Sequence, residues 1–233
     1  MNDPLPKILF TSLLVFISVL SFGQGWQFAA GPGAVLYKGD LLDWHLAPSS
    51  AQLQKMSPSV NLQVRYQEKN AFAYRAKFNF SSLQGDGSLN PLPVIGFSTK
   101  TFSSPLIDLS LITEYNFLDY QSNRKIKNWT PYLYGGVSGM FVSPTGSIPN
   151  PMTFFTFSIP YGIGVKYQIN PAWGVQFEFG TSKVLTDVID GMPSYVGSTL
   201  GSPDKFSFSQ GDQFLNSSLM FTYSIISIFC PKE

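Results

Sequence analysis

Seven charged residues occupy alternating positions within segments that otherwise have the pattern of β-strands, and their types could do chemistry. Two glutamates, or a lysine beside a glutamate, could form an acid–base or transport site if the fold brought them together. The same residues could instead neutralise one another inside a narrow β-barrel. The seven residues are Arg65, Arg75, Lys77, Asp108, Glu114, Lys166 and Glu178.

Other candidates for catalysis are isolated in the sequence. The single histidine, His45, lies in a polar stretch far from the single cysteine, Cys230, which cannot form a disulfide within the chain. Neither a Ser/His/Asp set nor a histidine-rich metal set accompanies the seven charges. We therefore expect a protein that is not an enzyme and holds no metal or cofactor. The charges should form a structural network, because an unpaired buried ion is costly.

Amphipathic strands must position these charges, and the pattern is most complete from Phe157 to Gly180. Apolar and polar or small residues alternate in two arms, which are joined by a tight turn at residues 169–172. A half-buried strand of a soluble sandwich would alternate in the same way. Here each apolar row runs for roughly ten residues, the length a tilted strand needs to cross a bilayer. Because Tyr167 and Trp173 also cluster at the turn end, the stretch predicts a transmembrane β-hairpin.

Six further segments have the same two-residue period, which gives an even total of eight strands. We expect an all-β, antiparallel, eight-stranded transmembrane barrel of the outer-membrane type, only wide enough to be filled by side chains. Long connections at residues 39–58, 82–104 and 187–211 alternate with shorter turns at 67–70, 118–128 and 169–172, so both termini should be periplasmic. The six segments are 26–38, 59–66, 72–80, 107–117, 129–139 and 215–225.

The first 23 residues have the features of a secretory signal peptide. Lys7 precedes an apolar run from Ile8 to Leu20, and the small-residue pattern Ser21, Phe22, Gly23 follows. The apolar run is too short for a spanning helix, and the absence of a cysteine near the cleavage point argues against a lipoprotein anchor. We expect a signal peptide at residues 1–23 and one barrel domain at residues 24–233.

The charge composition argues against a nucleic-acid partner. Lysine and arginine total 15, aspartate and glutamate total 14, and only 12% of residues are charged. A nucleic-acid binder needs a basic face to contact phosphates. We expect the lipids of a bacterial outer membrane to be the main surroundings.

Several segments resemble the PorG-like outer-membrane barrels. They are WQFAAGPGAVLYKGDL at 26–41, NFLDY at 116–120, TPYLYGGV at 130–137 and IPYGIGVKYQINPAWGVQFEFG at 159–180. The resemblance implies an eight-stranded barrel and a place in the type IX secretion and gliding machinery. It also implies partners, namely a periplasmic ring lipoprotein and its associated secretion subunits.

Two functions remain open at this point. The chain could be a non-enzymatic component of a type IX-like secretion assembly that anchors periplasmic ring partners, or a stand-alone barrel whose surface loops serve ligand binding or adhesion. The turn at residues 118–128 bears on the choice because it carries Arg124, Lys125 and Lys127. These cations could merely keep the turn in water, or they could help to dock a periplasmic partner.

Overall fold

The computed structural model describes residues 25–38, 53–68, 71–86, 101–118, 128–143, 145–146, 153–185, 195–196, 199–200 and 212–225. The expected signal peptide, the basic turn residues Arg124, Lys125 and Lys127, and both His45 and Cys230 lie outside these residues. The account below concerns the described part of the chain.

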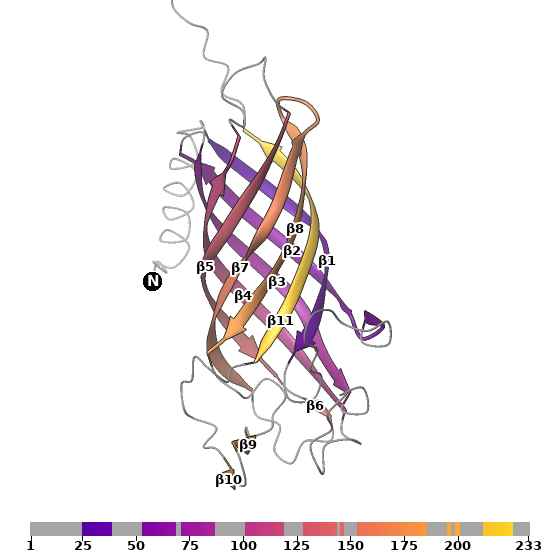
Figure 1. Cartoon of the computed structure of the whole chain (residues 1–233). Helices are drawn as coiled ribbons and strands as arrows, with labels where there is room; N and C mark the ends of the chain where they lie inside the picture. The colour runs from indigo at the N-terminus through magenta and orange to yellow at the C-terminus, as the bar shows by residue number, and fades with distance from the viewer. Residues whose placement is uncertain are drawn as a thin grey trace, which may run out of the picture.

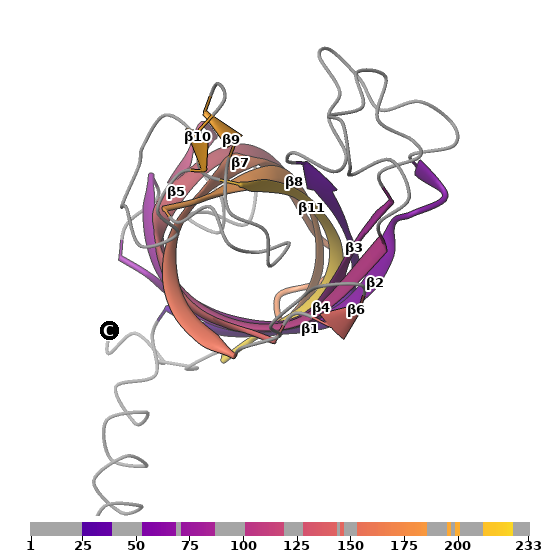
Figure 2. The same cartoon turned by 90° about the horizontal axis from the view of Figure 1, so that it is seen from below.

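Eight long antiparallel strands close into a barrel, which confirms the predicted fold class (Figures 1 and 2). The order around the barrel is β3-β2-β1-β11-β8-β7-β5-β4, and pairing of β3 with β4 closes the ring. Three two-residue strands, β6, β9 and β10, lie beyond the end that carries the long connections (Figure 1). The long strands are β1 (Trp26–Lys38), β2 (Ser57–Gln67), β3 (Phe72–Asp86), β4 (Thr101–Asn116), β5 (Trp129–Val142), β7 (Phe154–Gln168), β8 (Trp173–Val184) and β11 (Gln213–Ser224).

Several strands extend further towards the long connections than the sequence pattern predicts. Residues 82–86 and 101–104, expected to be loop, continue β3 and β4, with Leu83 opposite Ser104 and Asp86 opposite Thr101. The expected connection at 187–211 likewise contains the short strand pair β9 (Tyr195–Val196) and β10 (Thr199–Leu200), and β6 (Thr145–Gly146) pairs with β4. Backbone hydrogen bonds between the strands continue into residues whose side chains no longer alternate clearly. The predicted loops were therefore too long.

The two surfaces of the barrel have opposite polarity. Outward-facing side chains such as Leu111 and Val137 are 63% and 61% exposed, whereas the inward-facing Arg65 and Glu114 are 1% and 0% exposed. A protein folded in water buries its apolar residues and leaves its charges outside. The reversed arrangement is that of a barrel whose outer wall faces lipid. Within the described residues, no helix is long and apolar enough to cross a membrane.

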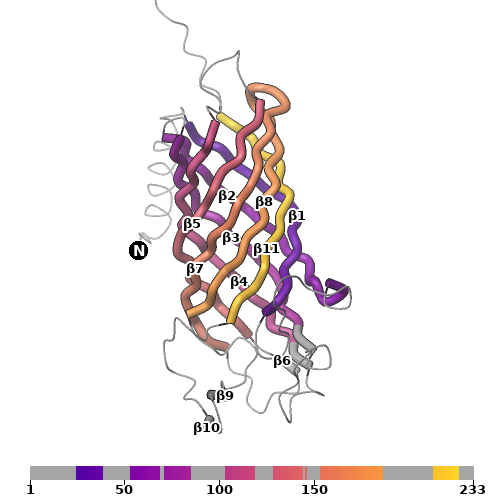
Figure 3. Tube along the Cα trace, in the orientation of Figure 1, coloured from indigo at the N-terminus to yellow at the C-terminus, as the bar shows by residue number. Residues whose placement is uncertain are grey.

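Aromatic side chains surround the barrel at the end that carries the short turns. Trp26 stacks near Tyr66 with ring centroids 5.2 Å apart, and Trp173 lies 5.0 Å from Tyr223. Tyr and Trp are enriched where a transmembrane wall meets the headgroup layer, so this end marks one edge of the membrane band. The chain enters and leaves the barrel at this end, because β1 and β11 are antiparallel neighbours with Gln27 opposite Ser224 (Figure 3).

Candidate functional site

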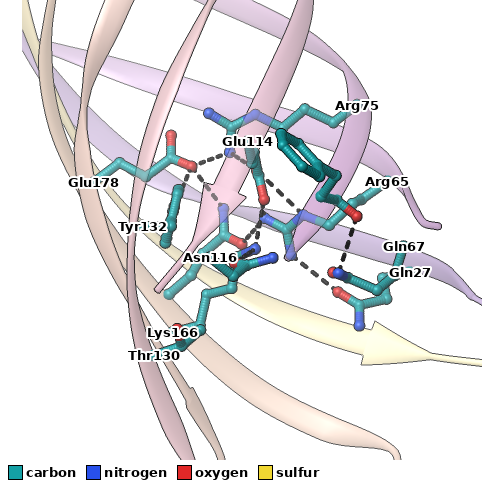
Figure 4. A network of polar contacts seen from close by, with 12 residues as sticks. Gln27, Arg65, Gln67, Arg75, Glu114, Asn116, Thr130, Tyr132, Lys166 and Glu178 are labelled. Carbon is teal, nitrogen blue, oxygen red and sulfur yellow. Dashed lines mark hydrogen bonds and ion pairs between the residues drawn. The ribbon is translucent and has the colours of Figure 1, made fainter. Parts of the chain in front are cut away.

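Inward-facing positions on five strands bring six of the seven predicted charges into one ionic network nearer the short-turn end. Figure 4 labels five of the six, all except Lys77. Two carboxylates are the centres of the network. Glu114 on β4 forms ion pairs with Arg65, Arg75 and Lys166, at 3.1 Å and 2.7 Å for the two arginines. Glu178 on β8 forms ion pairs with Arg75 and with Lys77, the latter at 3.1 Å. Arg75 therefore links the two carboxylates, and the network is Arg65, Arg75, Lys77, Glu114, Lys166 and Glu178.

Neutral polar side chains complete the shell around the ionic network. Tyr132 Oη donates a 2.6 Å hydrogen bond to Glu178, Arg65 donates to Gln27 at 2.9 Å, and Lys166 donates to Asn116 at 2.9 Å. These residues have the inward parity that the sequence predicts, so their position was available from the alternation. Their role as hydrogen-bond partners could not be predicted from the alternation, because it depends on which strands face one another across the barrel.

The Arg75 guanidinium is only partly satisfied by hydrogen bonds. Its Nη1 atom donates to Gln63 and to Glu178, whereas Nε and Nη2 are buried without a hydrogen-bond partner in the described part of the chain. The guanidinium carbon lies 4.8 Å from the centroid of the Tyr134 ring, and Lys166 Nζ lies 4.3 Å from that of Tyr132. Desolvated cation–π contacts of this kind are worth up to about 2 kcal/mol, so the two tyrosines offset part of the cost of burying these cations.

Asp108 is the exception to the prediction that all seven lumen charges pair. It is buried on β4, but its carboxylate accepts hydrogen bonds from Ser110, at 2.6 Å, and Ser138. Among the described residues it has no ion pair. The sequence shows which face Asp108 occupies, but it cannot show how far along the barrel axis the nearest cation lies.

A second filling layer lies at the opposite end, near the long connections. Nine buried residues from the ends of six strands form an apolar cluster, and Phe154 and Leu215 pack against it. The sequence analysis missed this layer, because it treated the inward parity as uniformly polar. The alternation contained the signal, since Leu83, Leu106 and Val184 share the parity of the lumen charges on their strands. The apolar cluster is Val35, Leu36, Tyr37, Leu83, Leu106, Met140, Val142, Val184 and Phe214.

Glycines on two adjacent strands make room for the lumen tyrosines. Gly162 on β7 is opposite Gly180 on β8, and a Cβ atom added to either one would lie within 3 Å of Tyr134 Oη and of the facing backbone. A Cβ on Gly164 would meet the Tyr132 ring just as closely. Glycine inside a strand often marks such a close approach. The absence of a side chain at these glycines therefore leaves the space that the two tyrosine side chains occupy.

The arrangement has the chemistry of a filled interior. Both network carboxylates are buried and engaged by cations, and the hydroxyl group beside Glu178 is that of Tyr132, which donates to it. No group of three or more His, Cys, Asp or Glu side chains that could hold a metal ion occurs in the part of the chain that the structure describes. Together, the ionic network and the apolar cluster occupy both halves of the lumen.

Comparisons with solved structures find small outer-membrane barrels. Ail of Yersinia pestis, crystallised with the heparin analogue sucrose octasulfate, is 12% identical, with a TM-score of 0.48 over 85% of this chain and 97% of that chain. Neisserial surface protein A is 15% identical, with a TM-score of 0.48 over 86% and 97%. A major outer membrane protein from Thermus thermophilus is 13% identical, with a TM-score of 0.48 over 86% and 99%. Likenesses this distant carry no argument about what the present chain binds.

The comparison with curated proteins gives no match. A family model, by contrast, matches residues 7–231, which is almost the whole sequence. Its description assigns a domain but no activity. The chain belongs to the family described as "Domain of unknown function (DUF6089)".

Proposed function

We propose that this protein is a non-enzymatic anchor in the bacterial outer membrane, rather than a pore or an enzyme. The observation that carries this proposal is the filled lumen, in which the ionic network and the apolar cluster occupy the two halves of the barrel. An eight-stranded barrel is too narrow for a side-chain-filled interior to leave an aqueous channel as well. Its function must then lie at the two ends or on the outer wall.

The finer proposal is that the barrel anchors periplasmic ring partners of a type IX-like secretion assembly. Its support is the resemblance of four segments to PorG-like barrels, together with the position of the basic turn. The described strands β4 and β5 flank that turn at the end where the chain enters and leaves the barrel. With this end in the periplasm, the turn that contains Arg124, Lys125 and Lys127 would be available to a ring lipoprotein, and clustered cations would steer its association in a salt-dependent way.

The test is recovery of the periplasmic partner from detergent-solubilised outer membranes, with the bound proteins identified. Replacing Arg124, Lys125 and Lys127 together with serine should leave a folded barrel in the membrane. Recovery of ring subunits should fall at low salt, and it should respond less to added salt than in the wild type. Lys55→Ser is the matched control, because Lys55 precedes β2 at the opposite end of the barrel. Equal recovery from the triple variant and the wild type at every salt concentration would contradict docking through this turn.

A stand-alone barrel with surface loops for ligand binding or adhesion is the second candidate. The observation that favours it is the distribution of connections, since residues 39–56, 87–100 and 185–212 join long strands at one end, which is far more chain than the short turns provide. Long loops held on a rigid scaffold are a common location for binding residues. If the protein purifies without periplasmic ring subunits while its loop end binds cells or matrix, this candidate replaces the anchor.

A further inference from the structure

A small polar cavity of about 20 Å³ lies in the lumen between the ionic network and the apolar cluster. Lys77, a member of the ionic network, and Phe214, a member of the apolar cluster, both line it. Its other walls include Asn79, Asp108 and Asn216. The cavity is therefore the place where Asp108, the lumen carboxylate without an ion pair among the described residues, comes near the network.

The register of β3 and β4 fixes the relation between Lys77 and Asp108. Lys77 is opposite Ser110 and Asn79 is opposite Asp108, so Lys77 and Asp108 are diagonal neighbours on the inner face. Diagonal side chains of an antiparallel pair start about 7–8 Å apart. A long side chain can span this distance, but Lys77 Nζ is directed to Glu178 at 3.1 Å, so a bridging molecule could join Lys77 to Asp108 in place of a direct ion pair.

Unused hydrogen-bonding capacity surrounds the cavity. The Oδ1 atoms of Asn79 and Asn216 are buried and have no hydrogen-bond partner among the residues that the structure describes. Lys77 Nζ has three hydrogens and donates to Glu178 at 3.1 Å, so it can donate further. Asp108 accepts from two serines and retains lone pairs. One donor group and three acceptor groups thus line the cavity.

The charges and partial charges of these groups determine what can bind in the cavity. A cation would be repelled by Lys77, and an anion would be repelled by Asp108 and by the two amide oxygens. Water accepts from the ammonium group and donates to the acceptors, so it alone satisfies both kinds of wall. The volume of the cavity is also sufficient, because a site of roughly 10–15 Å³ is enough to hold one water molecule.

We propose that this cavity is a buried water site that links Lys77 to Asp108. The bound water accepts a hydrogen bond from Lys77 Nζ and donates to Asp108 and to the unpartnered Oδ1 of Asn216 or Asn79. Through it, Asp108 is connected by hydrogen bonds to the Lys77 ammonium group, and the polar core extends from the ionic network towards the apolar cluster. This inference is independent of any secretion role.

The direct test is a high-resolution crystal structure of the wild-type protein in detergent. We expect solvent density in the cavity within hydrogen-bonding distance of Lys77 Nζ, of the Asp108 carboxylate and of Oδ1 of Asn216 or Asn79. Crystals soaked in bromide or in rubidium salts should show no anomalous peak there. An empty cavity, at a resolution where other lumen waters are ordered, would overturn the proposal, and an anomalous peak from either ion would show that the occupant is an ion.

The variant Asn216→Leu gives a second, thermodynamic test. It removes a buried carbonyl for which the described residues provide no hydrogen-bond partner, and it fills the cavity with apolar volume. In a dry cavity this substitution should leave the urea unfolding midpoint unchanged or raise it, because an unsatisfied buried group is lost. In a hydrated cavity it displaces the bridging water, so we expect a lower midpoint than the wild type. A midpoint equal to or above the wild-type value would count against the water site, and the crystallographic test stands even if the variant does not fold.

Discussion

Arg65 and Glu114 are hydrogen-bonded across the lumen although their strands are not neighbours in the sheet. Arg65 Nε and Nη2 both donate to Glu114 Oε1, at 3.2 and 3.1 Å, while β3 lies between β2 and β4 in the wall. The contact thus joins positions that no backbone ladder holds together. Buried ion pairs are weak evidence of net stability, but loss of one partner leaves the other charge uncompensated.

Glu114→Gln should destabilise the barrel strongly. The substitution keeps the shape of the side chain, but it removes the negative charge that Arg65, Arg75 and Lys166 share. Breaking a buried pair from one side costs about 3–5 kcal/mol. Urea unfolding in lipid vesicles measures the loss, with Glu68→Gln as the control because Glu68 is exposed at the end of β2. Equal midpoints for the two variants would refute the network.

Lys166→Glu should destabilise more than Lys166→Met. The methionine variant leaves Glu114 with its two arginine partners, whereas the glutamate variant adds a carboxylate beside Glu114 in a site where Lys166 is 1% exposed. Two carboxylates this close together in a low-dielectric interior repel each other, so keeping both ionised costs free energy of folding. The measurement is the unfolding midpoint of both variants at neutral pH. A Lys166→Glu midpoint equal to the wild-type value would mean that the side chain does not face the lumen.

Gly180→Ala should destabilise the barrel, whereas Gly135→Ala should not. A Cβ on Gly180 would lie within 3 Å of Tyr134 Oη and of the β7 backbone, but a Cβ on Gly135 would meet nothing within 4 Å. Overpacking of this kind costs about 1–3 kcal/mol. Thermal or urea unfolding of the two variants, side by side, separates steric crowding from the general effect of replacing glycine in a strand.

The purified barrel should show no large steady conductance in planar bilayers. Its lumen is crossed by the ionic network and by the apolar cluster, which leaves no room for a porin-sized water path. The same sample should migrate differently on a gel before and after boiling, which shows that the protein applied to the bilayer was folded. Porin-sized currents from heat-modifiable protein would disprove the filled lumen.

N-terminal sequencing of the membrane-extracted protein should begin at or near Gln24. The reason is the Ser21, Phe22, Gly23 pattern after a short apolar run. These residues lie outside the described part of the chain, so the prediction rests on sequence. An intact Met1 in mature outer-membrane material would be inconsistent with it.

Side-chain alternation was sufficient to predict the eight strands. It also predicted, for nearly every residue in them, whether the side chain points outward or into the lumen. The period of two is a local property of an extended backbone, so a row such as Phe72, Tyr74 and Ala76 shows its orientation without any knowledge of its neighbours. The lipid-facing wall and the inward position of all seven charges followed from the same pattern. Strand ends near the long connections were less accurate, because ladders there are maintained by backbone pairing and not by alternation.

Only the tertiary structure decided which inward residues meet. Closure of the barrel, strand stagger and tilt set the height of each side chain along the axis, and these quantities depend on all eight strands at once. They bring Arg75 between Glu114 and Glu178, which come from different strands, and they leave Asp108 with two serines. They also gather the apolar cluster at one end of a lumen that alternation alone presents as polar throughout. The sequence alone determines which face of a strand each side chain occupies, but the height of that side chain along the barrel axis is a property of the closed barrel.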